Sequence, residues 1–439
     1  MEINDNNILE FNQITYQKIV GAFFRYHREN KSLTLVDFAK KVNMNKGFLS
    51  DLENGKRHFP YGSIEQLSNA MNVTFSDDIT LYDEAISYLR NVFEDHFYQV
   101  SNEYSYISKL PFQNVKLLNS LGFFPMLIVN FYYSFYIEKN NKKALKIKHI
   151  LDKNISCLKI EELAYYYCFI SMYYKIKNNK IFSIKFLDKS IACSSKSPIV
   201  YAMSIFYLVD LHSSINRPLK AYKYLTEAEN LMNKHHNFIR LFECEILRCN
   251  ILTRLHLFEE SESTLIKILN YSEKNLNNSN YFKIYRHLAW NSLLAEKYDD
   301  CIHYTRLARD NGDFLGGLCY FIPYSYYKKG EYEKALNVLN EEYVHADNTY
   351  KPFLFAIRAR IRNKDSLFES HILKCYKILL SSQEYDGLSF TLNMMLEYYD
   401  EKHKSKMLIN TFKDMQSLNK NSLTVENSLL LKTIKKKKR

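Results

Sequence analysis

The chain has 439 residues, a formal net charge of +12 and only 10 Gly. Its length predicts about two to three domains with a substantial core. Gly makes up a much smaller share of the residues than the usual ~7%, and the sequence contains no GxGxxG, GxxxxGK[ST] or GxSxG run. These observations give no support to a nucleotide site built on glycine backbone or to a nucleophile elbow. No catalytic residue is therefore expected.

Neither a membrane span nor a secretory signal is expected. The most apolar run, residues 121–137, contains Gly122, Pro125 and Asn130, and the N-terminus is acidic and polar. The eight Cys form no CxxC pair, and no HExxH or similar metal spacing occurs. These features predict a cytoplasmic protein with free thiols and with no cofactor or metal.

Residues 1–75 differ in their sequence pattern from the rest of the chain and predict a small separate domain. Short polar turns divide them into four predicted helices, at 15–29, 34–42, 45–53 and 63–71. Thr34 and Asn45 are suitable N-caps, and Gly55 suits a left-handed helix end. The second and third helices therefore predict a helix-turn-helix.

This domain resembles the lambda-repressor-like (Xre-type) DNA-binding domains. The matching residues are Thr34, Phe38-Ala39, Leu49, Glu53, Gly55 and Arg57. Leu35 stands where the family commonly has a Gln that contacts DNA. The resemblance implies that the helix at 45–53 enters the major groove of DNA.

Short polar side chains on that helix suit base edges, and the flanking basic side chains suit phosphates. The residues expected to contact DNA are Lys40, Lys41, Asn45, Lys46, Gly47, Ser50, Lys56 and Arg57. An alternative is a helix-turn-helix that serves only for protein contact. At the other end of the chain, a basic tail at 431–439 holds six Lys and Arg in its last eight positions, and we expect it to be solvated.

Residues 76–110 predict a helical connector, and residues 111–430 predict helices with a countable period. Tyr298 and Cys301 recur 34 residues later as Tyr332 and Ala335, which is the tetratricopeptide period. Upstream, a small or apolar residue follows a turn at the comparable positions Ser261, Ala221, Ile184 and Ala144. Downstream, we expect a weaker repeat unit at 365–380 and a terminal pair of helices at 388–415. The prediction is an all-α chain, a lambda-repressor-like helix-turn-helix domain followed by a tetratricopeptide-like α-solenoid, with an irregular helical domain as the alternative.

The concave face of such a solenoid would collect polar and aromatic side chains from the first helix of each repeat. Asn can hold a peptide backbone, and Arg or Lys can hold its carboxylate. The candidate residues are Asn130, Tyr173, Asp210, Asn250, Arg254, Lys283, Arg286, Trp290, Tyr324 and Lys328. The alternative is that they are ordinary packing aromatics and solvated charges.

The order of the two domains resembles the peptide-pheromone-responsive (Rgg/PlcR/NprR, RRNPP) regulators of Gram-positive bacteria and their phages. The resemblance implies a homodimer that binds double-stranded operator DNA at paired half-sites and senses a short signalling peptide in the repeat groove. Asn130 and Asn250 are of the same residue type as the Asn that the family uses in its peptide groove. The function predicted is quorum-sensing transcription regulation. The alternative is a scaffold, or an inhibitor of a response regulator, that binds a protein partner constitutively.

Overall fold

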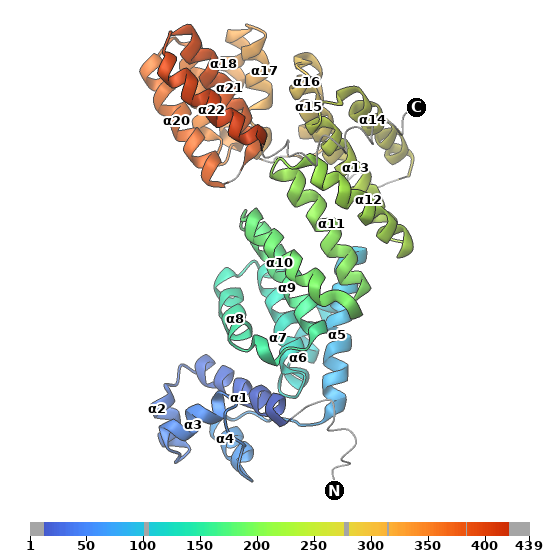
Figure 1. The fold of residues 1–439 in the computed structure, drawn as a ribbon, viewed down its shortest axis with the longest axis vertical. Helices are drawn as coiled ribbons and strands as arrows, with labels where there is room; N and C mark the ends of the chain where they lie inside the picture. Colours follow the sequence, from blue (N-terminus) through green and yellow to red (C-terminus); the bar gives the residue numbers. More distant parts are fainter. Residues whose placement is uncertain (1–12, 101–104, 276–280, 314–315, 383, 421–439) are drawn as a thin grey trace. The chain divides into compact units, whose positions relative to one another are not determined.

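The computed structural model describes residues 13–100, 105–275, 281–313, 316–382 and 384–420. Within these ranges the secondary structure is helical, apart from one isolated bridge between Ser76 and Ser120 (Figure 1). The predicted all-α fold is therefore confirmed. The basic tail lies outside the described residues. The chain forms two compact units, 1–174 with 185–204, and 175–184 with 205–439.

The first unit begins with four short helices, α1 (Gln13–Asn30), α2 (Leu35–Lys41), α3 (Lys46–Glu53) and α4 (Ser63–Met71). The side chain of Thr34 accepts a hydrogen bond from the Asp37 amide at 3.1 Å, and that of Asn45 accepts one from the Gly47 amide at 2.7 Å. Both predicted N-caps are confirmed. Gly55 has φ 62°, the left-handed conformation predicted for the end of α3.

A buried ion pair ties α1 to α3. Glu53 is buried, and Arg28 donates to its two carboxylate oxygens at 2.6 and 2.9 Å. The charge-assisted, bidentate geometry makes this a strong contact. It orients α3 relative to α1 and so sets the direction in which the exposed side of α3 faces.

The remaining helices of the first unit follow this domain. They are α5 (Ile79–Tyr98), η2 (Tyr106–Lys109), α6 (Leu110–Leu118), α7 (Phe123–Tyr132), η3 (Tyr133–Ile137), α8 (Asn141–Lys153), η4 (Ile155–Cys157), α9 (Ile160–Ile176), α10 (Lys180–Cys193) and η5 (Ser194–Lys196), the start of α10 belonging to the second unit. Of these, α7 and η4 pack against α1. The rings of Phe23 and Tyr26 lie 5.9 and 5.6 Å from that of Phe123. The connector expected at 76–110 is helical over α5 and η2. The Tyr82 hydroxyl of α5 donates a hydrogen bond to the buried Glu162 of α9 at 2.9 Å.

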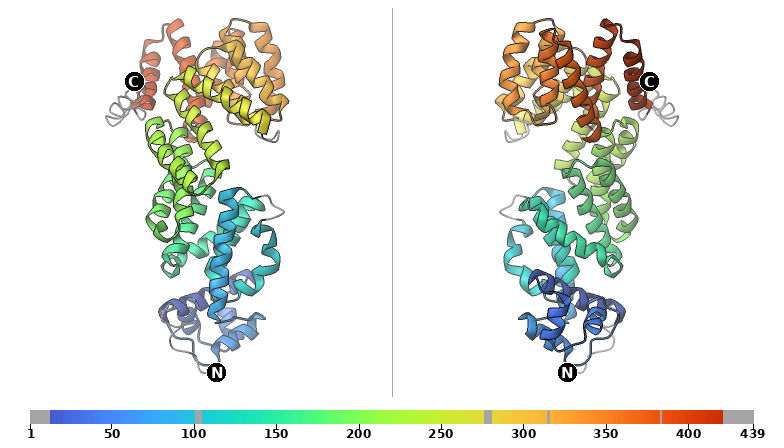
Figure 2. Two further views of the ribbon diagram at one scale, coloured as in Figure 1. Left: turned by 90° about the vertical axis from the view of Figure 1, so that its right-hand side faces the viewer. Right: turned by 90° about the vertical axis from the view of Figure 1, so that its left-hand side faces the viewer.

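The second unit is a series of antiparallel helix pairs (Figures 1 and 2). Its elements are α11 (Pro198–Ser214, from residue 205 onward), α12 (Pro218–Lys234), α13 (Phe238–Arg254), α14 (Phe258–Asn275), α15 (Tyr281–Leu294), α16 (Tyr298–Asp310), η7 (Gly316–Leu318), α17 (Phe321–Lys328), α18 (Tyr332–His345), α19 (Lys351–Ile361), α20 (Asp365–Ser382), α21 (Tyr385–Glu401) and α22 (Ser405–Lys420).

One turn geometry repeats along the array. Two residues before the second helix of each pair, the backbone is left-handed, with φ between 51° and 76°, at Lys139, Asn178, Asn216, His256, Glu296, Gly330, Asn363 and His403. The fourth residue of that helix is small and fully buried at Ala144, Ser183, Ala221, Ser261, Cys301 and Ala335. The repeat reading is confirmed, and the irregular alternative is not. At one position the register was wrong, because the buried small residue is Ser183 and not Ile184.

Candidate functional site

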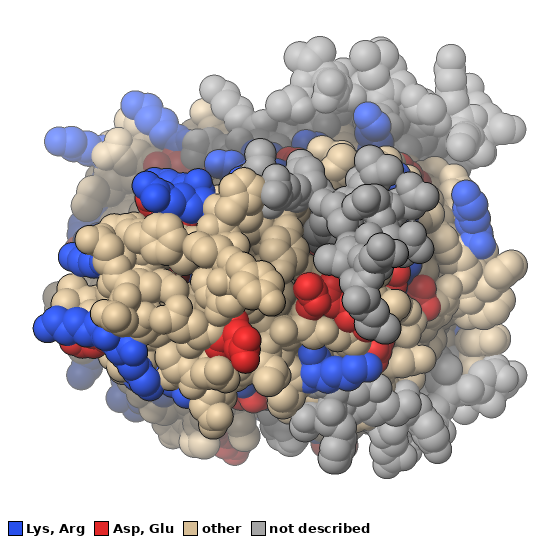
Figure 3. All heavy atoms as spheres, turned by 90° about the horizontal axis from the view of Figure 1, so that it is seen from below, with Lys and Arg blue, Asp and Glu red and all other residues tan. Residues whose placement is uncertain are grey.

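The predicted DNA-contacting residues gather on α2, α3 and the loop that follows α3. Seven of them are exposed and Ser50 is half-buried. Within the part of the chain that is described, Lys40, Lys41, Lys46 and Lys56 form no ion pair, so their charges are available to phosphates. Figure 3 views this end of the chain and shows Lys and Arg toward the edge of the face, with Asp and Glu between them.

Two of these residues also have structural contacts. The Asn45 side chain caps α3, and the Arg57 guanidinium donates to Asp51 at 3.0 Å while lying 5.6 Å from the centre of the Phe48 ring. Both contacts are at the surface. Asn54, which sequence reasoning did not select, lies at the end of α3 and donates to the Ser50 carbonyl at 2.6 Å.

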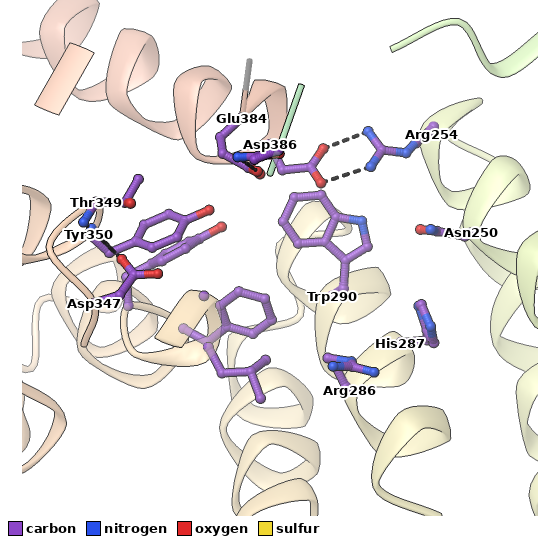
Figure 4. A pocket seen from close by; sticks show the side chains of 15 residues that line it. Asn250, Arg254, Arg286, His287, Trp290, Asp347, Thr349, Tyr350, Glu384 and Asp386 are labelled. Carbon is purple, nitrogen blue, oxygen red and sulfur yellow. Dashed lines mark hydrogen bonds and ion pairs between the residues drawn. The ribbon is translucent and has the colours of Figure 1, made fainter. Parts of the chain in front are cut away.

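A pocket of about 410 Å³ lies in the second unit. Its lining combines α13 and α15 with the start of α17, the turn between α18 and α19, and the start of α21 (Figure 4). The lining residues are Asn178, Asn250, Arg254, Arg286, His287, Trp290, Gly317, Leu318, Tyr320, Phe321, Asp347, Thr349, Tyr350, Glu384 and Asp386.

An ion pair spans one side of this pocket. Arg254 donates to the two carboxylate oxygens of Asp386 at 2.5 and 2.8 Å (Figure 4). Burial lowers the pKa of Arg254, but the charge of Asp386 and its hydrogen bonds outweigh burial and raise that pKa overall. The guanidinium is therefore permanently charged and held in one place.

Two residues of the pocket lining carry buried hydrogen-bond donors. Within the described residues, Trp290 Nε1 and Arg254 Nε are buried and have no hydrogen-bond partner. Leaving a buried donor unsatisfied costs about 1–3 kcal/mol. An acceptor oxygen that took the place of the atoms covering these donors would remove that cost.

Two further nitrogen-bearing side chains project from α15. Burial, and next the charge of Arg286, lower the pKa of His287 to about 3, so this imidazole is neutral near pH 7. Burial lowers the pKa of Arg286, and Asp313, at 3.6 Å, opposes that shift. The pocket thus offers a neutral imidazole beside two guanidinium groups.

Aromatic rings form the apolar part of the lining. Tyr320 and Tyr350 stack with their ring centres 5.3 Å apart, and Trp290 lies 5.9 Å from Phe321. Such surfaces suit an apolar side chain. Polar groups and rings together fit a short amphipathic ligand.

The structure brings together Asn250, Arg254, Arg286 and Trp290 of the ten predicted groove residues. The other six lie elsewhere. Asn130 and Tyr173 are buried in the first unit, and Tyr324 is buried between Phe353 and Phe390. Asp210 forms an ion pair with Lys175 at 2.5 Å, and Lys328 forms one with Glu397 at 2.6 Å. Lys283 is half-buried on α15, outside the pocket lining.

Sequence reasoning missed the part of the lining that comes from turns and a helix start. Asp347, Thr349 and Tyr350 precede α19. Glu384 precedes α21, and Asp386 is the second residue of that helix. A search limited to first-helix positions could not select them. The one signal in the sequence for Asp386 is that the predicted groove residue Arg254, once buried, needs a carboxylate partner.

Comparison with known proteins bears first on the N-terminal domain. Residues 24–77 match the family described as Helix-turn-helix. This domain is a helix-turn-helix domain. Its match to the family agrees with the cap and core geometry of α2 and α3. No curated protein matches the chain.

Solved structures are similar to most of the chain. A Rap protein complexed with Competence and Sporulation Factor has a TM-score of 0.63 at 15% identity, over 78% of this chain and 97% of that chain. Aspartyl phosphate phosphatase F from Bacillus subtilis has a TM-score of 0.51 at 16% identity, over 80% and 96% of the two chains. The Rap conjugation gene regulator of the plasmid pLS20, in complex with the Phr* peptide, has a TM-score of 0.50 at 13% identity, over 76% and 96%. At these identities the likeness shows a shared fold.

Three further observations concern helix length, the cysteines and clusters of possible metal ligands. None of the described helices has the length and apolar character needed to cross a bilayer. All eight Cys are free, and seven are buried. No group of three or more His, Cys, Asp or Glu in the described ranges is arranged to hold a metal ion.

Proposed function

We propose that this protein is a sequence-specific DNA-binding transcription regulator whose repeat region senses a short signalling peptide, as in quorum sensing. The helix-turn-helix match and the exposed basic residues around α3 support DNA binding. Structures of similar fold are complexes with Competence and Sporulation Factor and with the Phr* peptide, which supports a peptide as the ligand of the repeats.

The observation that carries the proposal is the set of hydrogen-bond donors on the residues that line the pocket. Trp290 Nε1 and Arg254 Nε need acceptors, and the Asn250 amide points toward the same space (Figure 4). A peptide supplies carbonyl oxygens along its backbone and a carboxylate at its C-terminus. The stacked Tyr320 and Tyr350 would hold one of its apolar side chains.

The proposal extends to a cytoplasmic homodimer. A dimer presents two recognition helices, so its operator would contain paired half-sites separated by about one turn of DNA, ~34 Å, or a multiple of it. The bound peptide would favour one arrangement of the two DNA-binding domains. No catalysed reaction is part of this function.

Two measurements test the proposal. Genomic fragments retained by the full chain are sequenced, and a recurrent motif with paired half-sites is expected. Separately, a library of short synthetic peptides, each made with a free and an amidated C-terminus, is titrated while the fluorescence of Trp290, the single Trp, is followed. Saturable binding that weakens on amidation is expected.

The alternative is a scaffold, or an inhibitor of a response regulator, that binds its protein partner constitutively. It predicts no enriched DNA motif and no saturable peptide binding, together with a stable complex with a folded protein. Those results would replace the regulator function.

A further inference from the structure

Helix α8 carries a dense positive charge that the proposed function does not use. Its thirteen residues, NKKALKIKHILDK, contain five Lys and one Asp. Lys142, Lys146, His149 and Lys153 are exposed and are spaced i, i+4, i+7 and i+11, which places them on one face of the helix. We call these four residues the α8 stripe.

The stripe is not neutralised by neighbouring carboxylates. Lys143 pairs with Glu138 at 2.9 Å and Lys148 with Asp152 at 2.6 Å, and both of these Lys lie outside the stripe. Within the described part of the chain, Lys142, Lys146 and Lys153 have no ion pair. Their charge is open to an anionic partner.

The stripe begins beside the helix-turn-helix domain, in the same compact unit. A pocket of about 380 Å³ is lined by Tyr26 and Asn30 at the end of α1 and by Lys142, Lys143 and Lys146 of α8. Figure 1 shows α8 on the side of the unit where α1 leads into α2. In a helix-turn-helix the first helix, here α2, crosses the DNA backbone. The stripe adjoins the end of α1, which leads through residues 31–34 into α2, and so lies near the element expected to meet phosphate.

The charge balance of the DNA-binding domain favours DNA as this partner. Residues 1–75 hold nine Lys and Arg against eight Asp and Glu, so the domain itself is nearly neutral. Phosphate contacts supply much of the affinity of a protein for DNA. At 1.5 Å per residue the stripe extends ~16 Å, enough to face several phosphates.

We propose that the α8 stripe is a second DNA-binding surface, which contacts the phosphate backbone of the duplex next to the site read by α3. The choice of DNA as the anion rests on the proposed DNA-binding function. The stripe would add affinity without adding sequence preference, because phosphates are the same at every position. It would also make the repeat region part of the DNA complex.

The test uses the full chain with Lys142→Gln, Lys146→Gln and Lys153→Gln combined. The matched control combines Lys220→Gln, Lys223→Gln and Lys234→Gln, which removes three exposed charges from α12 in the second unit. Circular dichroism first establishes that both variants fold. DNA affinity is then measured from 50 to 200 mM salt, on a long duplex from the genomic selection and on a random duplex of equal length.

Losing three phosphate contacts should lower the slope of log affinity against log salt by about 2.7 and weaken binding roughly 10- to 100-fold near 100 mM salt. The loss should be similar on both duplexes, and the control should behave as wild type. Equal slopes for the α8 variant and the control would overturn the inference while leaving α3 as the DNA-binding element. Failure of the wild-type chain to bind either duplex would overturn the DNA-binding function and this inference with it.

Discussion

Arg254 and Asp386, 132 residues apart in sequence, join α13 to the start of α21 by two parallel hydrogen bonds. Together with Trp290 they also line a second pocket of about 110 Å³, so the pair lies between two cavities of the second unit. Glu384, in the same segment, accepts from Asn178 at 3.0 Å. These contacts hold the start of α21 against the pocket.

Asp386→Asn should destabilise the second unit, because it leaves the Arg254 charge buried without its counter-charge. Breaking a buried pair costs about 3–5 kcal/mol. Since a third of the Asp386 side chain is exposed, we expect a smaller cost of about 2 kcal/mol. The measurement is urea unfolding followed by Trp290 fluorescence. Asp365→Asn breaks the exposed pair with Lys402 and should cost less than about 1 kcal/mol; equal shifts for the two variants would contradict the account.

Glu162 should make the stability of the first unit depend on pH. Burial raises the pKa of this carboxyl to about 7, against an ordinary value of 4.5. Between these values the folded state binds more protons than the unfolded state, so the free energy of unfolding should fall as pH rises from 4.5 to 7. Denaturant unfolding followed by circular dichroism at several pH values measures this slope.

Glu162→Gln should remove that contribution to the slope, since the amide does not titrate. Glu94→Gln, at an exposed position of α5 that forms no ion pair within the described residues, is the matched control and should leave the slope as in wild type. An unchanged slope in Glu162→Gln would show that other groups produce the pH dependence.

Ser50→Glu should weaken DNA binding through α3. A carboxylate on this half-buried position would face phosphates and leave base-edge acceptors unpaired, at about 1–3 kcal/mol per lost contact. Asn69→Glu, on the exposed side of α4, adds the same charge to the same domain and is the control. Affinity for the selected operator is measured by fluorescence anisotropy. Wild-type affinity in a folded Ser50→Glu variant would remove this face of α3 from the DNA site.

Asn250→Ala should weaken peptide binding about 5- to 150-fold, the equivalent of about 1–3 kcal/mol, by leaving peptide backbone groups unpaired. DNA binding without peptide should be retained. Asn233→Ala, at an exposed position of α12, is the control and should bind peptide as wild type does. Trp290 fluorescence reports both titrations, and equal affinity in the two variants would place the peptide elsewhere.

The helices of the helix-turn-helix domain could be predicted to within about two residues because their signals are local. Thr34, Asn45 and Gly55 act on the backbone beside them. The Arg28 to Glu53 contact could not be predicted in this way, because it depends on how α1 and α3 cross. Local signals specify the elements, and packing specifies which charges meet.

The repeats could be predicted most reliably from the sequence where the residue in the turn is a glycine. Gly330 is the only Gly among the eight left-handed turn residues, and the unit it begins matched the repeat pattern closely. Where Asn178 fills the same position, the turn signal is weaker and the register was misplaced by one residue, from Ser183 to Ile184. Only four of the fifteen residues that line the pocket were predicted. Others, such as Tyr350 and Asp386, come from segments that only the packing of the repeats brings to α13 and α15.

Peptide binding and DNA binding should be coupled, and reciprocal titration measures this coupling. Operator affinity is measured with and without the best-binding library peptide, and peptide affinity is measured with and without operator, in the same buffer. We expect each affinity to change by at least about 5-fold, and by the same factor in both directions, because coupling free energies are reciprocal. Peptide affinity that is unchanged by operator would contradict the account and would favour a constitutive scaffold.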